Sequence, residues 1–396
     1  MIRETSLALW TTTAITRRQN STECTNLRGS SAAQPVRVLA LTKYDRRAAS
    51  SRYRLLQYIP HLAARGVSVI PRPLLNDSYV EALFAGKRAS PAEIAASFVR
   101  RISALLSTPR FDLLWIEGEI FPRLPATAER VLGALRIPYV IDLDDAIFHT
   151  YDRHPQIAFR KLLGRKIDAV FRNAVAVMAG NAYLADRAVA AGAPRVVTVP
   201  TAIDHQAYER IARAQDGDRV FGWIGSPGTA RYLQTVETEL AELCRALPAS
   251  LCLIGLQPDN PPKPYATYRP WAEDTEIAEL AVCDIGLAPL SDGPWERGKC
   301  GLKAIQYMAA GIPVLAAKVG ALPDIVVHGE TGFVYSSGEE FTAFAKQLAQ
   351  DADLRHRMGA AGRARVAAHY SVHGWADTVA DLLITSAGAP RAAPAE

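Results

Sequence analysis

Two lysines flank a glycine turn in the segment ERGKCGLKAIQYMAAGIPVL, residues 296–315. Apolar residues recur at helical spacing after the turn, which places Lys299 and Lys303 at the start of a predicted helix. A helix N-terminus carries partial positive charge and disfavours a cation by about 0.3–1 kcal/mol. Two cations there therefore indicate an anion between them, and free backbone N–H groups beside glycines suit the oxygens of a phosphate. The alternative is two solvated lysines on an exposed turn.

A second candidate phosphate site is GWIGSPG, residues 222–228, between a predicted strand and a predicted helix. Its spacing is not the G-x-G-x-x-G of a dinucleotide fingerprint, and no acid follows at the ribose position. A strand-to-helix loop can still direct backbone amides at a phosphate, here around Gly225, with Ser226 and Thr229 as hydroxyl donors. We favour this interpretation over a tight turn that only caps the helix.

Three carboxylates follow one predicted strand in IDLDDAIF, residues 141–148. Asp142, Asp144 and Asp145 could orient hydroxyls, act as a base or bind a metal. The alternative is an acid-rich turn that caps the next segment. Three acids at one strand end, in an otherwise basic half of the chain, favour a functional role.

Arginines gather beside the first predicted strand. Arg52 and Arg54 lie at the start of the first predicted helix, so the argument for an anion applies to them as well, though more weakly. Arg46 and Arg47 precede them in the same loop. The chain contains no H-E-x-x-H motif and no Ser–His–Asp signature.

The elements that must position these residues belong to a globular α/β protein. The chain has 396 residues, 49% of them hydrophobic and 21% charged, which predicts two or three domains. No apolar run is long enough to span a membrane, and the first residues lack a clear secretion signal. Five scattered cysteines form no C-x-x-C pair, so we expect neither a disulfide framework nor a zinc site, and a cytoplasmic location.

Charge is unevenly distributed along the chain. Residues 35–200 contain 24 Lys+Arg against 14 Asp+Glu, whereas residues 201–396 contain 17 against 24. A basic half joined to an acidic half suggests that the first half faces phosphates or an anionic membrane surface.

Strand and helix patterns alternate from residue 36 to residue 200, and the alternation restarts at residue 219. The strands are short and almost continuously apolar, which is typical of parallel sheets covered on both faces. We therefore predict two Rossmann-like, doubly wound parallel-sheet domains facing a cleft. Residues 256–270 are predicted to be a proline-rich loop, and ETGFVY, residues 330–335, a hairpin-like segment.

Three stretches carry a family resemblance. GLKAIQYMAAGIPVLAAKVGALPDIVVHGETGFVY resembles the second-domain signature of the retaining glycosyltransferases of family 4, which are two-Rossmann-domain enzymes of the GT-B type. VPTAIDHQAY, with Asp204, is similar to the segment that joins the two domains in this family. The pattern around WADTVADLL resembles the family's last helix, which crosses back to the first domain.

The sequence also departs from the family pattern. The family's two glutamates, eight positions apart, fall on Gly298 and Gln306, and Glu296 is the nearest replacement for the first. The usual Arg/Lys pair after the first strand of the second domain is missing, since only Arg231 is present. Asp144 occupies the place of the family's histidine.

The resemblance implies transfer of a sugar from a nucleotide-sugar donor to an acceptor hydroxyl, with retention and without a metal or other cofactor. Lys299 and Lys303 would supply the missing positive charge for the donor's diphosphate. The expected site residues fall into three groups. The catalytic ones are Asp144, Lys299 and Lys303; the donor-binding ones are Gly225, Ser226, Thr229, Glu296, Gln306 and Asp324; the acceptor-side ones are Arg52, Arg54 and Asp145.

The expected organisation follows from the same resemblance. It comprises a flexible extension (1–34), an acceptor domain (35–200), a connection (201–218), a donor domain (219–370), a helix crossing back (371–387) and a disordered tail (388–396). The expected acceptor is a carbohydrate or a lipid-linked molecule, such as those used in cell-surface polysaccharide or glycolipid synthesis, reached at the inner face of the membrane. No nucleic-acid partner is expected. The alternatives are a nucleotide-sugar epimerase on the same fold and a catalytically silent nucleotide-sugar-binding protein.

Overall fold

The computed structural model describes residues 34–84, 86–87, 90–209, 218–258 and 261–388. Its described residues from Pro35 onward form one compact unit. The expected extension (1–34) and tail (388–396) fall, apart from Gln34 and Gly388, outside the described residues, as do Cys24 and residues 210–217 of the expected connection. The predicted domain boundaries stay predictions.

The first half of the chain folds into a six-stranded parallel sheet with the order β2-β1-β3-β4-β5-β6. Its strands are β1 Val36–Leu41, β2 Val67–Pro71, β3 Leu113–Glu117, β4 Tyr139–Leu143, β5 Ala176–Ala179 and β6 Val196–Thr198. Separate clusters of buried apolar side chains cover its two faces. Burial on both faces explains why these strands are almost continuously apolar.

The second half forms another six-stranded parallel sheet, with the order β12-β11-β10-β7-β8-β9. Its strands are β7 Arg219–Ile224, β8 Ala249–Ile254, β9 Ala266–Arg269, β10 Ile285–Ala288, β11 Val314–Ala317 and β12 Gly332–Tyr335. The predicted α/β fold with two parallel sheets is confirmed.

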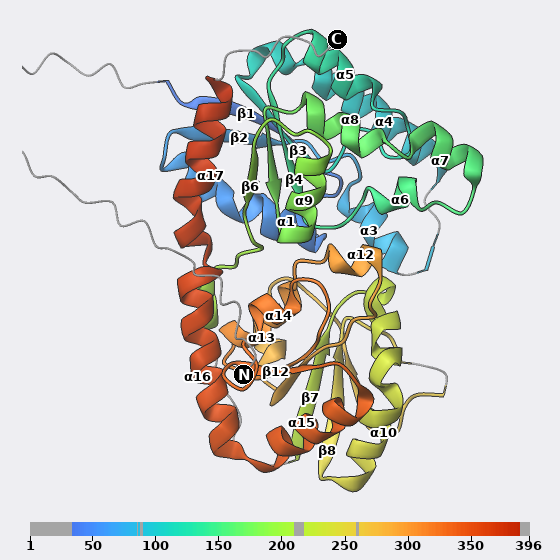
Figure 1. Ribbon diagram of the computed structural model, residues 1–396, viewed down its shortest axis with the longest axis vertical. Helices are drawn as coiled ribbons and strands as arrows, with labels where there is room; N and C mark the ends of the chain where they lie inside the picture. The colour runs from blue at the N-terminus through green and yellow to red at the C-terminus, as the bar shows by residue number, and fades with distance from the viewer. Residues whose placement is uncertain (1–33, 85, 88–89, 210–217, 259–260, 389–396) are drawn as a thin grey trace, which may run out of the picture. The chain divides into compact units, whose positions relative to one another are not determined.

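Helices connect the strands and pack on the sheets (Figure 1). The α-helices are α1 Ala49–Arg54, α2 Ile59–Ala63, α3 Asp77–Phe84, α4 Pro91–Leu106, α5 Thr127–Ala134, α6 His149–Asp152, α7 Ile157–Leu163, α8 Lys166–Asn173, α9 Ala182–Ala190, α10 Glu237–Ala246, α11 Glu276–Leu280, α12 Pro294–Arg297, α13 Leu302–Ala309, α14 Leu322–Ile325, α15 Gly338–Gln350, α16 Ala352–His369 and α17 Val372–Ala387. The 3₁₀ segments are η1 Leu56–Tyr58, η2 Thr108–Arg110, η3 His205–Tyr208 and η4 Pro227–Val236.

The last two helices divide between the sheets. Helix α16 packs on α13 and β12 of the second half, and α17 packs on α2, β2, β3 and β4 of the first (Figure 1). Apolar residues of α17, among them Val379 and Leu383, join the buried cluster on one face of the first sheet.

The structure corrects three local predictions. The proline-rich loop contains edge strand β9, which pairs only with β8, and an edge tolerates the prolines that flank it. The hairpin-like segment is instead β12, which runs parallel to β11 after the crossover through α14. The helix predicted after GWIGSPG, near residues 230–246 by its sequence pattern, begins at Glu237, because Pro227 and Gly228 start a 3₁₀ segment instead.

Candidate active site

Two adjoining cavities lie where loops from the carboxyl ends of both sheets meet. One has a volume of about 470 Å³ and the other about 270 Å³. Loops after β1 and β4 line them from the first half, and loops after β7 and β10 line them from the second. This is the edge at which open parallel sheets bind ligands. Thr229 and Lys303 line both cavities.

Lys303 lies in the first turn of α13, which begins directly after Gly301. The backbone of Gly301 has a φ of 66°, in the left-handed region that glycine adopts without strain. The Lys303 ammonium lies 3.4 Å from Thr229 Oγ1 and 3.9 Å from the centroid of the Trp223 ring. Within the described part of the chain, no carboxylate pairs with it. Burial, and secondarily Lys299, lowers the pKa of Lys303 to about 7. A half-buried lysine without a carboxylate partner among the described residues is suited to an anionic ligand.

Lys299 lies in the loop before α13 and reaches across to the first half. Its Nζ lies 3.2 Å from Asp145 Oδ1, and both side chains are about one-quarter to one-third exposed, at 25% and 31%. Burial would lower the pKa of Lys299, but Asp145 together with Tyr232 and Asp144 outweighs burial, and the pKa is raised. Burial raises the pKa of Asp145 to about 6 although Lys299 opposes this.

The loop after β7 brings Gly225, Ser226 and Thr229 beside Lys303, and their role at a phosphate site stays a prediction. A Cβ at Gly225 would lie 2.6 Å from Lys303 Nζ and 2.8 Å from Thr229 Oγ1, so this position has room only for glycine. The Thr229 hydroxyl donates to Ser226 O, at 3.0 Å, which closes the loop.

A buried carboxylate that the sequence reasoning missed lies at one end of the larger cavity. Glu276, in α11, accepts hydrogen bonds from Arg52 at 3.2 Å, Trp271 at 2.5 Å and Gln306 at 2.7 Å, and also from the Tyr53 hydroxyl. Four donors saturate its two oxygens. Arg52 and Tyr53 come from the first half and the other two from the second, so Glu276 ties the halves together. The only signal in the sequence is an acid at the start of a short helix that also contains apolar residues.

The arginine cluster beside β1 is neutralised by acids of the chain itself. The pairs are Arg46–Glu273 at 2.7 Å, Arg47–Glu81 at 3.1 Å, Arg52–Glu276 at 3.2 Å and Arg54–Asp142 at 2.5 Å. Arg54 and Asp142 are both buried, and a further Arg54 donor goes to Val199 O. Arg52 and Arg54 still line the cavities. However, the anions that their position predicts are carboxylates of the protein itself. These two arginines therefore give no evidence for an anionic acceptor, which corrects the prediction.

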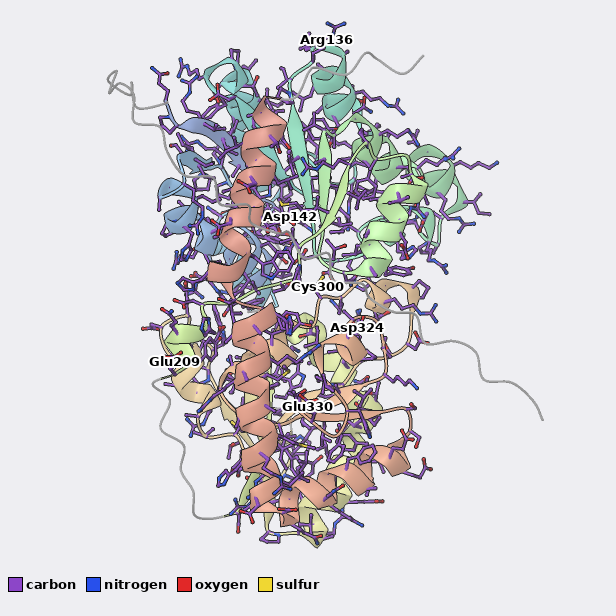
Figure 2. All side chains as sticks on the ribbon, turned by 60° about the vertical axis from the view of Figure 1, so that its left-hand side comes forward. Arg136, Asp142, Glu209, Cys300, Asp324 and Glu330 are labelled. Carbon is purple, nitrogen blue, oxygen red and sulfur yellow. The ribbon has the colours of Figure 1, made fainter. Side chains whose placement is uncertain are left out.

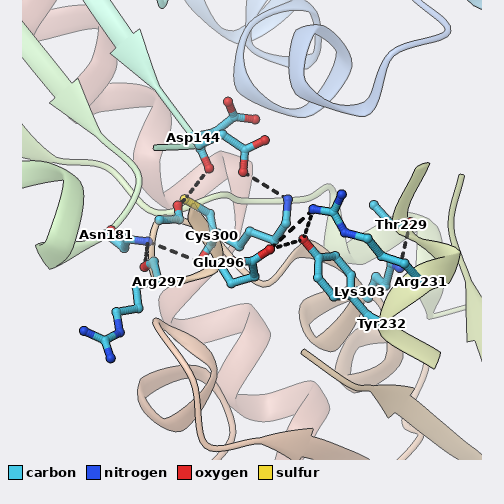
Figure 3. A network of polar contacts seen from close by, with 12 residues as sticks. Asp144, Asn181, Thr229, Arg231, Tyr232, Glu296, Arg297, Cys300 and Lys303 are labelled. Atoms are coloured by element: carbon cyan, nitrogen blue, oxygen red, sulfur yellow. Dashed lines mark hydrogen bonds and ion pairs between the residues drawn. The ribbon is translucent and has the colours of Figure 1, made fainter. Parts of the chain in front are cut away.

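The remaining predicted residues lie in three different surroundings. Asp144 lines the smaller cavity with its carboxylate, and its backbone oxygen accepts from the Cys300 thiol at 3.1 Å (Figure 3). Gln306 is buried in the Glu276 network and lines the larger cavity. Glu296 lines neither cavity, because its carboxylate binds the Tyr232 hydroxyl at 2.8 Å and Arg231 at 3.4 Å (Figure 3).

Asp324 is not brought to Lys299 and Lys303. Its side chain is exposed in a separate pocket, with Lys318 and Arg297 (Figure 2). Its backbone oxygen accepts from Arg365. This geometry gives no support to the expected contact between Asp324 and the donor sugar.

Among the described residues, no group of three or more His, Cys, Asp or Glu side chains could hold a metal ion. None of the described helices is both long enough and apolar enough to cross a bilayer.

Comparison with known proteins finds glycosyltransferases similar to the part of the chain that carries this site. Residues 218–351, which contain the loop after β7 and both lysines, match the family model described as Glycosyl transferases group 1. A D-inositol 3-phosphate glycosyltransferase from Streptomyces scabiei is 49% identical over 78 residues, 19% of this chain and 16% of that protein. An N-acetyl-alpha-D-glucosaminyl L-malate synthase from Bacillus anthracis is 24% identical over 195 residues, 43% of this chain and 49% of that protein. This chain therefore spans less than half the length of either relative.

Solved structures resemble a larger part of the chain. Anabaena HepE in complex with UDP-glucose has a TM-score of 0.65 at 15% identity, covering 88% of this chain and 99% of that one. Sucrose-phosphate synthase from Thermosynechococcus elongatus has a TM-score of 0.64 at 15% identity, covering 88% and 98%. At such low identity the likeness shows the fold alone, which is the two-domain α/β fold of GT-B glycosyltransferases, as the sequence predicted.

Proposed function

We propose that the protein is a retaining glycosyltransferase that moves a sugar from a nucleotide-sugar donor to an acceptor hydroxyl. The observation that carries this proposal is Lys303, a half-buried cation without a carboxylate partner among the described residues, in the wall shared by two cavities. The match to the glycosyltransferase group 1 model over the surrounding residues supports it, and the UDP-glucose bound to the structurally similar HepE is consistent with it.

The donor's diphosphate binds against Lys299, Lys303 and the loop after β7. As the bond between the sugar and the diphosphate breaks, negative charge grows on the leaving oxygen. Fixed cations and hydroxyl donors around that oxygen stabilise the transition state more than the ground state. The lysines already neutralise the diphosphate, so the proposed mechanism uses no metal or other cofactor.

Carboxylates of the first half face the reacting carbon from the other side. Asp144 lines the smaller cavity and forms no ion pair within the described residues, although Lys299 and Arg54 interact with it electrostatically, and its oxygens are available to orient a hydroxyl of the sugar or the acceptor. Gln306 and Glu276 lie at the far end of the larger cavity, where the nucleoside is proposed to bind. Gln306, which Glu276 holds in place, carries polar groups that can select ribose hydroxyls.

The acceptor is proposed to be a carbohydrate or a lipid-linked molecule that approaches the first half. The overall positive charge of residues 35–200 supports weak, salt-sensitive attraction to an anionic membrane surface. The four paired arginines beside β1 contribute little to this attraction. Co-sedimentation with neutral and anionic vesicles tests it, and equal binding to both would remove the membrane from the proposal.

Turnover of a donor panel tests the proposed activity. UDP-, GDP- and ADP-sugars are incubated with the protein, and release of nucleoside diphosphate is measured with and without a mixture of acceptor glycosides. A transferase releases one nucleotide faster when acceptors are present. Formation of an epimer without acceptor would indicate an epimerase, and tight binding without release a silent binding protein.

A further inference from the structure

The loop that carries Lys299 is attached to the first half of the chain at three consecutive positions. A Cβ at Gly298 would lie 2.6 Å from the Ala146 backbone nitrogen, so the two backbones are in close contact there. Asn181 Nδ2 donates to Lys299 O at 3.1 Å (Figure 3). The Cys300 thiol donates to Asp144 O at 3.1 Å.

Cys300 forms the deepest of these attachments. Its side chain is 8% exposed and packs with the buried apolar cluster of the first half, although the residue belongs to the second half by sequence. The sulfur occupies the space beside Gly180, directly after β5, where a Cβ would overlap it. Gly180 is not in the left-handed region, so the thiol rather than the backbone conformation demands glycine there. Burial raises the pKa of the thiol far above its usual value, which makes it a packing group and not a nucleophile.

We propose that Cys300 and Gly180 together act as a positioning pair for Lys299. The sulfur fills the gap above Gly180, and this fixes the loop so that the Lys299 ammonium points at Asp145 and the smaller cavity. The role of Lys299 in binding a diphosphate rests on the proposed function; the docking of the loop does not. Lys299 itself contacts the ligand, and Cys300 and Gly180 act only through it.

A size exchange between the two positions tests the pair. Gly180→Ala pushes the thiol out, and Cys300→Ala leaves a gap, so each single variant should loosen the loop. In the double variant Gly180→Ala/Cys300→Ala the new methyl group enters the space that the sulfur has left. The double variant should therefore recover most of the loss. Gly374→Ala, at a glycine with open space around it, and Cys244→Ala are the matched controls.

Two measurements on these variants test whether Cys300 and Gly180 position Lys299. The first, without ligand, is the acylation rate of the Lys299 amine, followed by mass spectrometry. Gly180→Ala should raise it several-fold because the ammonium leaves Asp145, and the double variant should return it toward wild type. An unchanged rate in Gly180→Ala, or no recovery in the double variant, would overturn the positioning role.

The second measurement is UDP affinity. Gly180→Ala should weaken it by about tenfold, as loss of one charge-assisted contact does. In a Lys299→Ala background, Gly180→Ala should not weaken UDP binding further, because the lysine through which it acts is already absent. A further tenfold loss of UDP affinity in that background would show that Gly180 affects binding independently of Lys299. If the wild type binds no nucleoside diphosphate, the proposed function fails, while the acylation rates still decide the positioning role.

Discussion

The ammonium group of Lys303 lies 3.9 Å from the centroid of the Trp223 ring, at the carboxyl end of β7. A cation over an indole face is stabilised, but far less than by a carboxylate. The ring therefore does not compensate for the burial of the ammonium, and the pKa of Lys303 is lowered to about 7. Near pH 7 only part of the protein molecules carry a charged Lys303. A diphosphate beside it would restore the charged form.

This lowered pKa predicts the pH dependence of nucleotide binding. Below pH 7 Lys303 is protonated in both the free and the bound protein, so UDP affinity is constant with respect to this group. Above pH 7 the free protein loses the proton that the complex retains, so affinity should fall several-fold between pH 7 and about pH 8.5. Calorimetry at several pH values checks this. Lys303→Met should bind UDP weakly, and its UDP affinity should not change with pH between pH 7 and about pH 8.5. If the affinity of the variant still falls with pH in that range, the pH dependence belongs to another group.

Glu276 should be a major determinant of stability. Glu276→Gln leaves the buried Arg52 without a counter-charge, and breaking a buried pair costs about 3 kcal/mol or more. The control is Glu279→Gln, since the Arg269–Glu279 pair is more exposed, at 43% and 21%, and should cost under about 1 kcal/mol. Denaturant unfolding measures both. Equal losses would show that the Glu276 network is not a structural link.

Asp144 should matter for transfer more than for nucleotide binding. Asp144 lines the smaller cavity and forms no ion pair within the described residues. Asp144→Asn should lower the transfer rate by about a hundredfold, the lower end of the range for a positioned acid–base group. UDP affinity should stay within about twofold. Asp292→Asn, at an exposed pair, is the control. Equal loss of rate and of affinity would place Asp144 in the diphosphate site instead.

The proposed metal-free chemistry predicts that activity survives a chelator. Lys299 and Lys303 neutralise the diphosphate in the role that a divalent cation has in other transferases. Transfer is measured before and after dialysis against EDTA and should change little. Loss of transfer that magnesium or manganese restores would contradict this mechanism.

Much of the fold could be predicted from local patterns. Continuous apolar strands and capped helices predict two parallel sheets, because burial on both faces removes the polar alternation of exposed strands. Strand β9 was missed because it is short, at a sheet edge and flanked by prolines. The direction of β12 depends on the crossover through α14, which a four-residue strand pattern does not encode.

That three residues of the candidate site lie together could be predicted from the sequence. Gly225, Thr229 and Lys303 meet because two loops end at the same sheet edge, and the topology requires this. Glu276 was not predictable, since its bond to Arg52 joins positions 224 residues apart. For the same reason, the charge of the arginine cluster could be counted from the sequence, but its neutralisation could not.

The central claim is that Lys299 and Lys303 bind the diphosphate of a nucleotide donor. Calorimetric titration of UDP, GDP and ADP into the wild type and into Lys299→Ala/Lys303→Ala at pH 7 tests it most directly. We predict that the wild type binds at least one of these nucleotides and that the double variant binds it at least about a hundredfold more weakly, from two contacts of roughly 1.5–3 kcal/mol each. Equal affinity in the wild type and the double variant, or no binding of any of the three by the wild type, would contradict the claim.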